Sequence, residues 1–134
     1  MGNGQILIIS NNPLVKNIKD MDVYFVPGSA LQVLYQAYHH TAAGHRLLSH
    51  PLSGSFKAGV NPYRSVVLSG FKTAVDLAAL TMLEKCISIV ESGDHNSVKA
   101  EDDFALDFQK TDRYLLDSTL QSLMEVRCFD GRDL

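Results

Sequence analysis

The stretch QILIISNNP, which runs from Gln5 to Pro13, decides the fold class. It opens with an unbroken apolar run from Ile6 to Ile9, in which three of the four residues are isoleucine. Such runs are typical of strands that are buried on both faces, as in a parallel sheet with helices on each side. The residues that follow, Ser10 to Pro13, favour a turn and the start of a short helix. The stretch therefore predicts a central strand that ends in a polar turn.

Patterns later in the chain extend this prediction. A second strand is expected at 22–26, close enough for a short parallel crossover, and a helix is expected between an N-cap at Ser29 and a stop at Gly44. The later elements are a weak strand at 46–49, a long loop at 50–63, a strand at 65–69, a helix capped at Thr73 and ended by Gly93, a polar loop at 94–103 and a helix at 104–126. Alternation of this kind predicts one α/β domain over residues 1–134, a layered fold with a mostly parallel sheet of about four strands flanked by helices. The tail at 128–134 is expected to fray.

Composition excludes several classes of protein. The chain has 134 residues, of which 46% are hydrophobic and 20% charged, a balance that suits one domain with a real core. A net charge of -3 and the lack of a basic run argue against nucleic-acid binding. No apolar segment approaches the roughly 20 residues that cross a bilayer, and the first residues lack a signal-peptide pattern. The expected location is therefore the cytoplasm.

The first candidate site segment is the polar turn after the opening strand. Ser10, Asn11 and Asn12 offer a hydroxyl, two amides and the N–H groups of a helix start, which together can hold a carboxylate or a phosphate. Plain turn and capping chemistry explains the same residues, since Asn and Pro are common turn residues in any case. Both interpretations stand at this point.

The second candidate segment is the 50–63 loop, which is longer than most loops in compact domains. Its proline and aromatic anchors predict an ordered loop, with Leu52, Phe56 or Tyr63 packed against the body. The side chains and turn that we expect to bind an anion are His50, Ser53, Gly54, Ser55, Lys57 and Tyr63. A purely structural loop is the alternative, and a Ser53 nucleophile activated by His50 is a sharper hypothesis. Because ligands bind beyond the carboxyl ends of strands in open α/β sheets, we expect this loop and the Ser10–Pro13 turn to meet at one edge.

The other polar residues give weaker evidence for a functional site. His39, His40 and His45 contain no i, i+4 pair and no carboxylate completes a set, so they are interpreted as a solvated helix face and no metal site is predicted. Asp112 is interpreted as a solvated carboxylate early in the last helix, and Asp117 as a surface partner of Arg113.

Three stretches resemble the GrdX family, small proteins encoded beside the glycine reductase system of anaerobic amino-acid-fermenting bacteria. They are NNPLV at 11–15, GHRLLSHPLSGS at 44–55 with NPYRS at 61–65, and DRYLLD at 112–117, and the middle one is the most specific. The resemblance implies a cytosolic accessory role in glycine or betaine reductase metabolism. It implies no known activity, and no catalytic residues can be carried over from it.

The leading hypothesis is a non-catalytic accessory or regulatory protein that binds a small anionic metabolite or a partner subunit, such as a glycine reductase component, at the 10–13 and 50–63 loops. The second is a small enzyme that acts on a carboxylate or acyl-phosphate metabolite at the same place. The third is a structural interaction module that uses its helix faces. The cofactor, the catalytic residues and the oligomeric state stay open.

Overall fold

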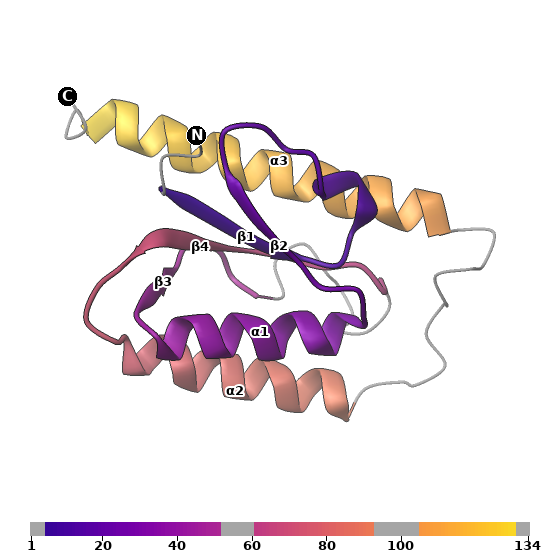
Figure 1. Cartoon of the computed structure of the whole chain (residues 1–134), viewed down its shortest axis with the longest axis horizontal. Coiled ribbons are helices and arrows are strands. Elements are labelled where there is room, and N and C mark those ends of the chain that lie inside the picture. Colours follow the sequence, from indigo (N-terminus) through magenta and orange to yellow (C-terminus); the bar gives the residue numbers. More distant parts are fainter. Residues whose placement is uncertain (1–4, 52–60, 93–104, 131–134) are drawn as a thin grey trace.

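The computed structural model describes residues 5–51, 61–92 and 105–130, with side chains up to residue 124. Its strands are β1 (Ile6–Ser10), β2 (Asp22–Phe25), β3 (His45–Leu47) and β4 (Ser65–Lys72), and its helices are α1 (Ala30–Ala42), α2 (Leu77–Glu91) and α3 (Ala105–Asp130), with a 3-10 turn, η1, at Pro13–Val15. The four strands form one sheet in the order β2-β1-β4-β3. α1 and α2 cover one face of this sheet and α3 crosses the other (Figure 1).

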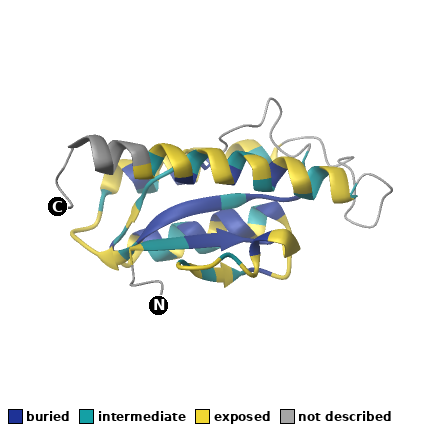
Figure 2. Cartoon of the chain, turned by 90° about the horizontal axis from the view of Figure 1, so that it is seen from above, coloured by how far each residue is buried: buried dark blue, intermediate teal, exposed yellow. Residues whose placement is uncertain are grey.

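The sheet is mixed, so the prediction of a mostly parallel sheet is wrong in this respect, although the α/β class is confirmed. Only β1 and β2 pair in parallel, whereas β4 runs antiparallel to both of its neighbours, β1 and β3. The apolar run of β1 reflects packing on both faces, with Leu7 and Ile9 on one side and Ile6 and Ile8 on the other. Figure 2 shows buried strands between the helices, which cover the sheet whatever the strand direction. The chain between β3 and β4 contributes no helix among its described residues, so nothing there builds a parallel crossover.

Each face of the sheet has its own core. Ile9 of β1 and Leu68 of β4 pack with Leu34 of α1 and Leu83 of α2 on one side. Ile8 and Val67 face the other way and pack with residues of α3. This alternation follows from the two-residue period of a strand, which sends successive side chains to opposite faces.

Local sequence signals explain where α1 begins and ends. Ser29 accepts a hydrogen bond from the main-chain N–H of Gln32, whose side chain returns one to Ser29, which completes a capping box. At the other end Gly44 has a φ of 113°, a conformation that favours glycine. Both predicted boundaries are therefore confirmed.

The start of α2 differs from the prediction. Asp76, not Thr73, is the N-cap, because its carboxylate accepts from the main-chain N–H groups of Ala78 and Ala79 at 3.0 and 3.2 Å. Thr73, which follows β4, instead donates its main-chain N–H to the carbonyl of Gly44 at 2.8 Å. The predicted stop at Gly93 and the loop at 94–103 lie outside the described residues. Within the ranges that are described, no helix is both long and apolar enough to cross a bilayer.

Candidate functional site

The two predicted site segments meet at one end of the sheet. Since β1 and β3 both run antiparallel to β4, they point the same way, and the residues that follow them lie at the same end. A contact confirms this placement: the guanidinium of Arg64, which precedes β4, donates to the carbonyl of Pro51 at 3.1 Å, while the main-chain N–H of Arg64 donates to Oδ1 of Asn11 at 2.9 Å. We call this end of the sheet the polar edge, formed by residues 10–13, 50–51 and 61–65 with the start of α3.

A series of hydrogen bonds runs through Ser10, the last residue of β1, to Asp112 in α3. Ser10 faces Ser65 in the antiparallel register, and their hydroxyl oxygens lie 2.8 Å apart. Ser65 donates its proton to Oδ2 of Asp112 at 2.7 Å, so Ser10 must donate to Ser65. The main-chain N–H of Asn12 then donates to the Ser10 oxygen at 3.0 Å. The hydroxyls of Ser10 and Ser65 therefore both donate their protons to groups of the protein.

Asn11 joins three segments of the polar edge. Its amide nitrogen donates to the carbonyls of Gly28 and Pro62, both at 2.9 Å, and its oxygen accepts from Arg64. It thereby ties the end of β1 to the approach to α1 and to the entry of β4. Because these bonds use both amide hydrogens and the oxygen, Asn11 acts as a positioning residue.

Asn12 connects the polar edge to α3 in the same manner. Its oxygen accepts from the main-chain N–H of Leu14 at 2.9 Å, which caps η1, and its nitrogen donates to the carbonyl of Gln109 and to Oδ2 of Asp112, each at 2.9 Å. The capping interpretation of the turn is therefore correct for this residue, and the amide also holds α3 in place.

Asp112 and Arg64 place two ionisable groups in this buried network. Asp112 is 8% exposed and Arg64 is 3% exposed. Burial raises the pKa of Asp112, while its hydrogen bonds from Asn12 and Ser65 and the charge of Arg64 oppose that rise. Burial likewise lowers the pKa of Arg64 and the nearby Asp112 opposes the fall. An arginine guanidinium does not lose its proton in proteins, so Arg64 keeps its positive charge.

Tyr63 anchors the far end of the 50–63 segment. It is buried, which confirms that one of the predicted anchors packs against the body, and its hydroxyl accepts from the side chain of Gln109 at 2.9 Å. Beside it, Asn61 accepts from the N–H of Tyr63 and donates to the carbonyl of Phe108 at 3.2 Å. The first turn of α3 thus holds residues 61–63.

The predicted site residues separate into two groups. Ser10, Asn11, Asn12 and Tyr63 come together in the network, and His50 is exposed next to buried Pro51. Leu52, Ser53, Gly54, Ser55, Phe56 and Lys57 lie outside the described residues.

Sequence reasoning missed Asp112, Arg64 and Gln109. The solvated interpretation of Asp112 is wrong, although the surface pair of Arg113 and Asp117, 2.9 Å apart, is as predicted. A signal for Asp112 was available, because it lies four and eight residues before Leu116 and Leu120, which are both buried on the face of α3 toward the sheet.

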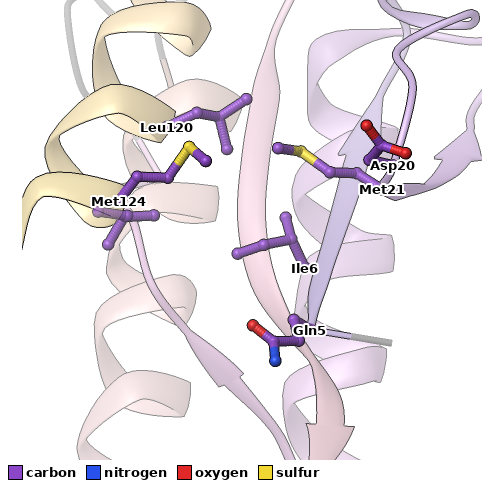
Figure 3. Close-up of a pocket in the computed structure, with 7 residues that line it drawn as sticks. Gln5, Ile6, Asp20, Met21, Leu120 and Met124 are labelled. Carbon is purple, nitrogen blue, oxygen red and sulfur yellow. The ribbon is translucent and has the colours of Figure 1, made fainter. Parts of the chain in front are cut away.

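A separate pocket of about 200 Å³ lies near the opposite end of β1, between the strand and the second half of α3 (Figure 3). Met21, Leu120 and Met124 converge on it, with Ile6 beside them. It is mostly apolar, is lined by one charged side chain, Asp20, and is smaller than most small-molecule sites. The polar edge therefore remains the stronger candidate.

Comparison with known proteins assigns the chain to a family. The model of the GrdX-like protein family matches residues 7–121, and the chain belongs to this family. The match includes every segment of the polar edge, from the end of β1 to the start of α3. Neither a curated protein nor a solved structure matches the chain.

Proposed function

We propose that this GrdX-like protein is a non-catalytic accessory or regulatory protein of glycine or betaine reductase metabolism that binds a small anionic ligand, or an anionic group of a partner subunit, at the 10–13 and 50–63 loops, whose described residues lie at the polar edge. One observation carries the proposal. Of the seven buried polar or charged side chains among the described residues, five gather at this edge: Ser10, Asn11, Asn12, Arg64 and Asp112.

Such a cluster contributes less to the free energy of folding than apolar side chains of similar volume would. Desolvating charged groups disfavours folding, and even well-paired buried charges seldom stabilise a protein more than apolar side chains of similar volume do. Groups whose pKa is shifted by burial and by a specific charged neighbour are enriched at functional sites. The position of Arg64 and Asp112 at the carboxyl ends of β1 and β3 supports the same conclusion, since ligands in open α/β sheets bind there.

The network also holds both ends of the 52–60 segment. Arg64 holds the carbonyl of Pro51 on one side, and Asn11 and Gln109 hold Pro62 and Tyr63 on the other. Fixing these ends lowers the conformational entropy that the segment can lose when a ligand binds. We therefore assign direct contact with the anion to Ser53, Gly54, Ser55 and Lys57 with exposed His50, and assign positioning to the buried network.

The test is calorimetry with the full chain and a panel of inorganic phosphate, acyl phosphates and small carboxylates. Saturable binding is expected for at least one class, and Lys57→Ala should weaken it about tenfold or more, a loss of about 1.4 kcal/mol. Lys85→Ala is the matched control, because Lys85 is an exposed lysine of α2 on the other face of the sheet. Equal affinity in the two variants would contradict the assignment.

The interaction-module hypothesis has an observation of its own in its favour. α3 exposes Leu106, Tyr114 and Met124, at 51, 70 and 58%. Apolar side chains exposed along one helix suit contact with another protein. If no anion binds at millimolar concentration while a Tyr114→Ala variant loses partners that the parent captures from a glycine-fermenting lysate, this second function replaces the first.

A further inference from the structure

Two histidines lie side by side where the chain leaves α1 and enters β3. His40 belongs to the last turn of α1 and His45 begins β3, and the turn at Gly44 brings them together with ring centres 5.5 Å apart. Their spacing of five residues is not a helical ligand spacing, so the sequence pattern gives no sign of the pair. The reversal of the chain at Gly44 creates it.

Both imidazole rings are held in the same protonation pattern. Nδ1 of His40 lies 2.8 Å from the carbonyl oxygen of Gln36, and Nδ1 of His45 lies 2.7 Å from that of Ser69. A carbonyl oxygen only accepts hydrogen bonds, so each Nδ1 must carry the proton. In the neutral ring the Nε2 atom then carries the lone pair. Histidines that bind metals almost always donate their other ring N–H to a group of this kind.

The separation of the rings agrees with a shared metal ion. A Zn–N bond of about 2.0–2.1 Å places the ion about 3.2 Å from each ring centre, and a tetrahedral angle then places the centres about 5.2 Å apart. The observed 5.5 Å between the ring centres, with the ring planes inclined by 56°, is close to this spacing.

The neighbours of the pair define the kind of site. The ring of Tyr24 meets His40 edge-on at 5.0 Å, and Lys72 lies opposite His45 in the register of β3 and β4. Lys72 is exposed, so its ammonium group can extend into water while its stem stays on the strand. Across the described ranges no cluster of three or more His, Cys, Asp or Glu side chains could hold a metal ion. Among the described residues the pair therefore offers two nitrogen ligands.

We propose that His40 and His45 bind one divalent transition-metal ion through their Nε2 atoms. Imidazole nitrogen suits Zn²⁺, Ni²⁺ and Cu²⁺, and Cu²⁺ should bind most tightly of the three. The site is independent of the polar edge, because it lies where β3 begins, at the other end of the sheet from Ser10 and Pro51.

Calorimetry of the untagged full chain with Zn²⁺ and with Cu²⁺ tests this site. We expect one saturable ion per chain, and we expect His40→Asn and His45→Asn each to weaken binding about tenfold or more. Asparagine retains a short N–H donor toward the carbonyl but lacks the Nε2 ligand, so these variants should keep their fold. His39→Ala is the matched control, since His39 is the adjacent exposed histidine of α1 and should leave affinity unchanged.

A second measurement does not depend on binding. Nitrogen-15 shifts of the two rings at pH 8 should show protonated Nδ1 and unprotonated Nε2. The proposal fails if both rings carry the proton on Nε2, if no ion binds at millimolar concentration, or if His39→Ala reduces affinity as much as the asparagine variants do.

Discussion

Replacing Asp112 tests the buried network at its centre. In Asp112→Ala the donors of Ser65 and Asn12 lose the oxygen that both contact, and the buried Arg64 loses a nearby negative charge. Each unsatisfied buried donor costs about 1–3 kcal/mol, and relief of the carboxylate's own desolvation offsets part of the sum. We expect the free energy of unfolding at pH 7 to fall by about 2–4 kcal/mol. At about 4 °C per kcal/mol, the melting temperature should fall by about 8–16 °C.

Asp112→Asn is the matched control for this variant. Both hydrogen bonds reach the same carboxylate oxygen, Oδ2, so the amide oxygen of asparagine can take its place. The asparagine variant should therefore retain most of the stability of the parent and lose about 1 kcal/mol or less at pH 7.

The difference in stability between the parent and Asp112→Asn should depend on pH, and the sign of this dependence is fixed by the pKa of Asp112. The pKa of Asp112 in the folded state is raised above its ordinary 3.8. In the pH window between 3.8 and the folded-state pKa, the folded state therefore binds the proton more tightly than the unfolded state. The resulting stability is fully present below that window and is lost as the pH rises through the folded-state pKa. The stability of the parent relative to Asp112→Asn should therefore decrease as the pH increases from about 3.8.

Urea denaturation followed by circular dichroism, at pH values from below about 3.8 up to about 8, measures both effects. The reasoning is refuted if Asp112→Ala is as stable as Asp112→Asn at pH 7. It is also refuted if the parent gains stability over Asp112→Asn as the pH increases, because that result requires a lowered pKa.

Four further substitutions test other parts of the account. Gly44→Ala should lower the free energy of unfolding by about 1–3 kcal/mol in a urea melt, since φ is positive there and a Cβ would lie 2.7 Å from the carbonyl oxygen of Thr73. Ser29→Ala should cost about 1 kcal/mol in the same assay through loss of the capping box, and an unchanged midpoint would count against that reason. Lys57→Ala should weaken anion binding in calorimetry, and the difference from the parent should shrink as salt is added. Asn11→Ala should lower stability by about 1–3 kcal/mol and weaken anion binding with little salt dependence, because the Asn11 amide is uncharged and acts through its hydrogen bonds; affinity equal to that of the parent would count against this role.

Local signals explain why much of the fold could be predicted. The apolar run of β1 and the caps at Ser29 and Gly44 act within a few residues, so they can be read directly from the sequence. The direction of β4 could not be read in this way, because it depends on how distant segments pair. Burial on both faces has the same sequence pattern in parallel and mixed sheets.

At the candidate site, too, local sequence signals could be interpreted, whereas contacts between distant segments could not. Ser10, Asn11 and Asn12 stand out because polar residues follow a buried strand directly, and they do lie in the network. Asp112 contacts Asn12 across a hundred positions of the chain, so neither partner indicates the other. Its helical phase relative to Leu116 predicted burial, whereas its charge predicted exposure. The hydrogen bonds from Asn12 and Ser65 reverse that second expectation, since they satisfy the buried carboxylate.

The most direct test of the central claim is amide chemical-shift mapping of the full chain during titration with phosphate, an acyl phosphate and a small carboxylate. The account predicts saturable shifts for one of these anions in residues 10–13 and 50–65 and in the turn of α3 around Asp112, with no comparable change in α2. Shifts that do not saturate at millimolar concentration, or saturable shifts confined to the pocket near Ile6 and Met124, would contradict it.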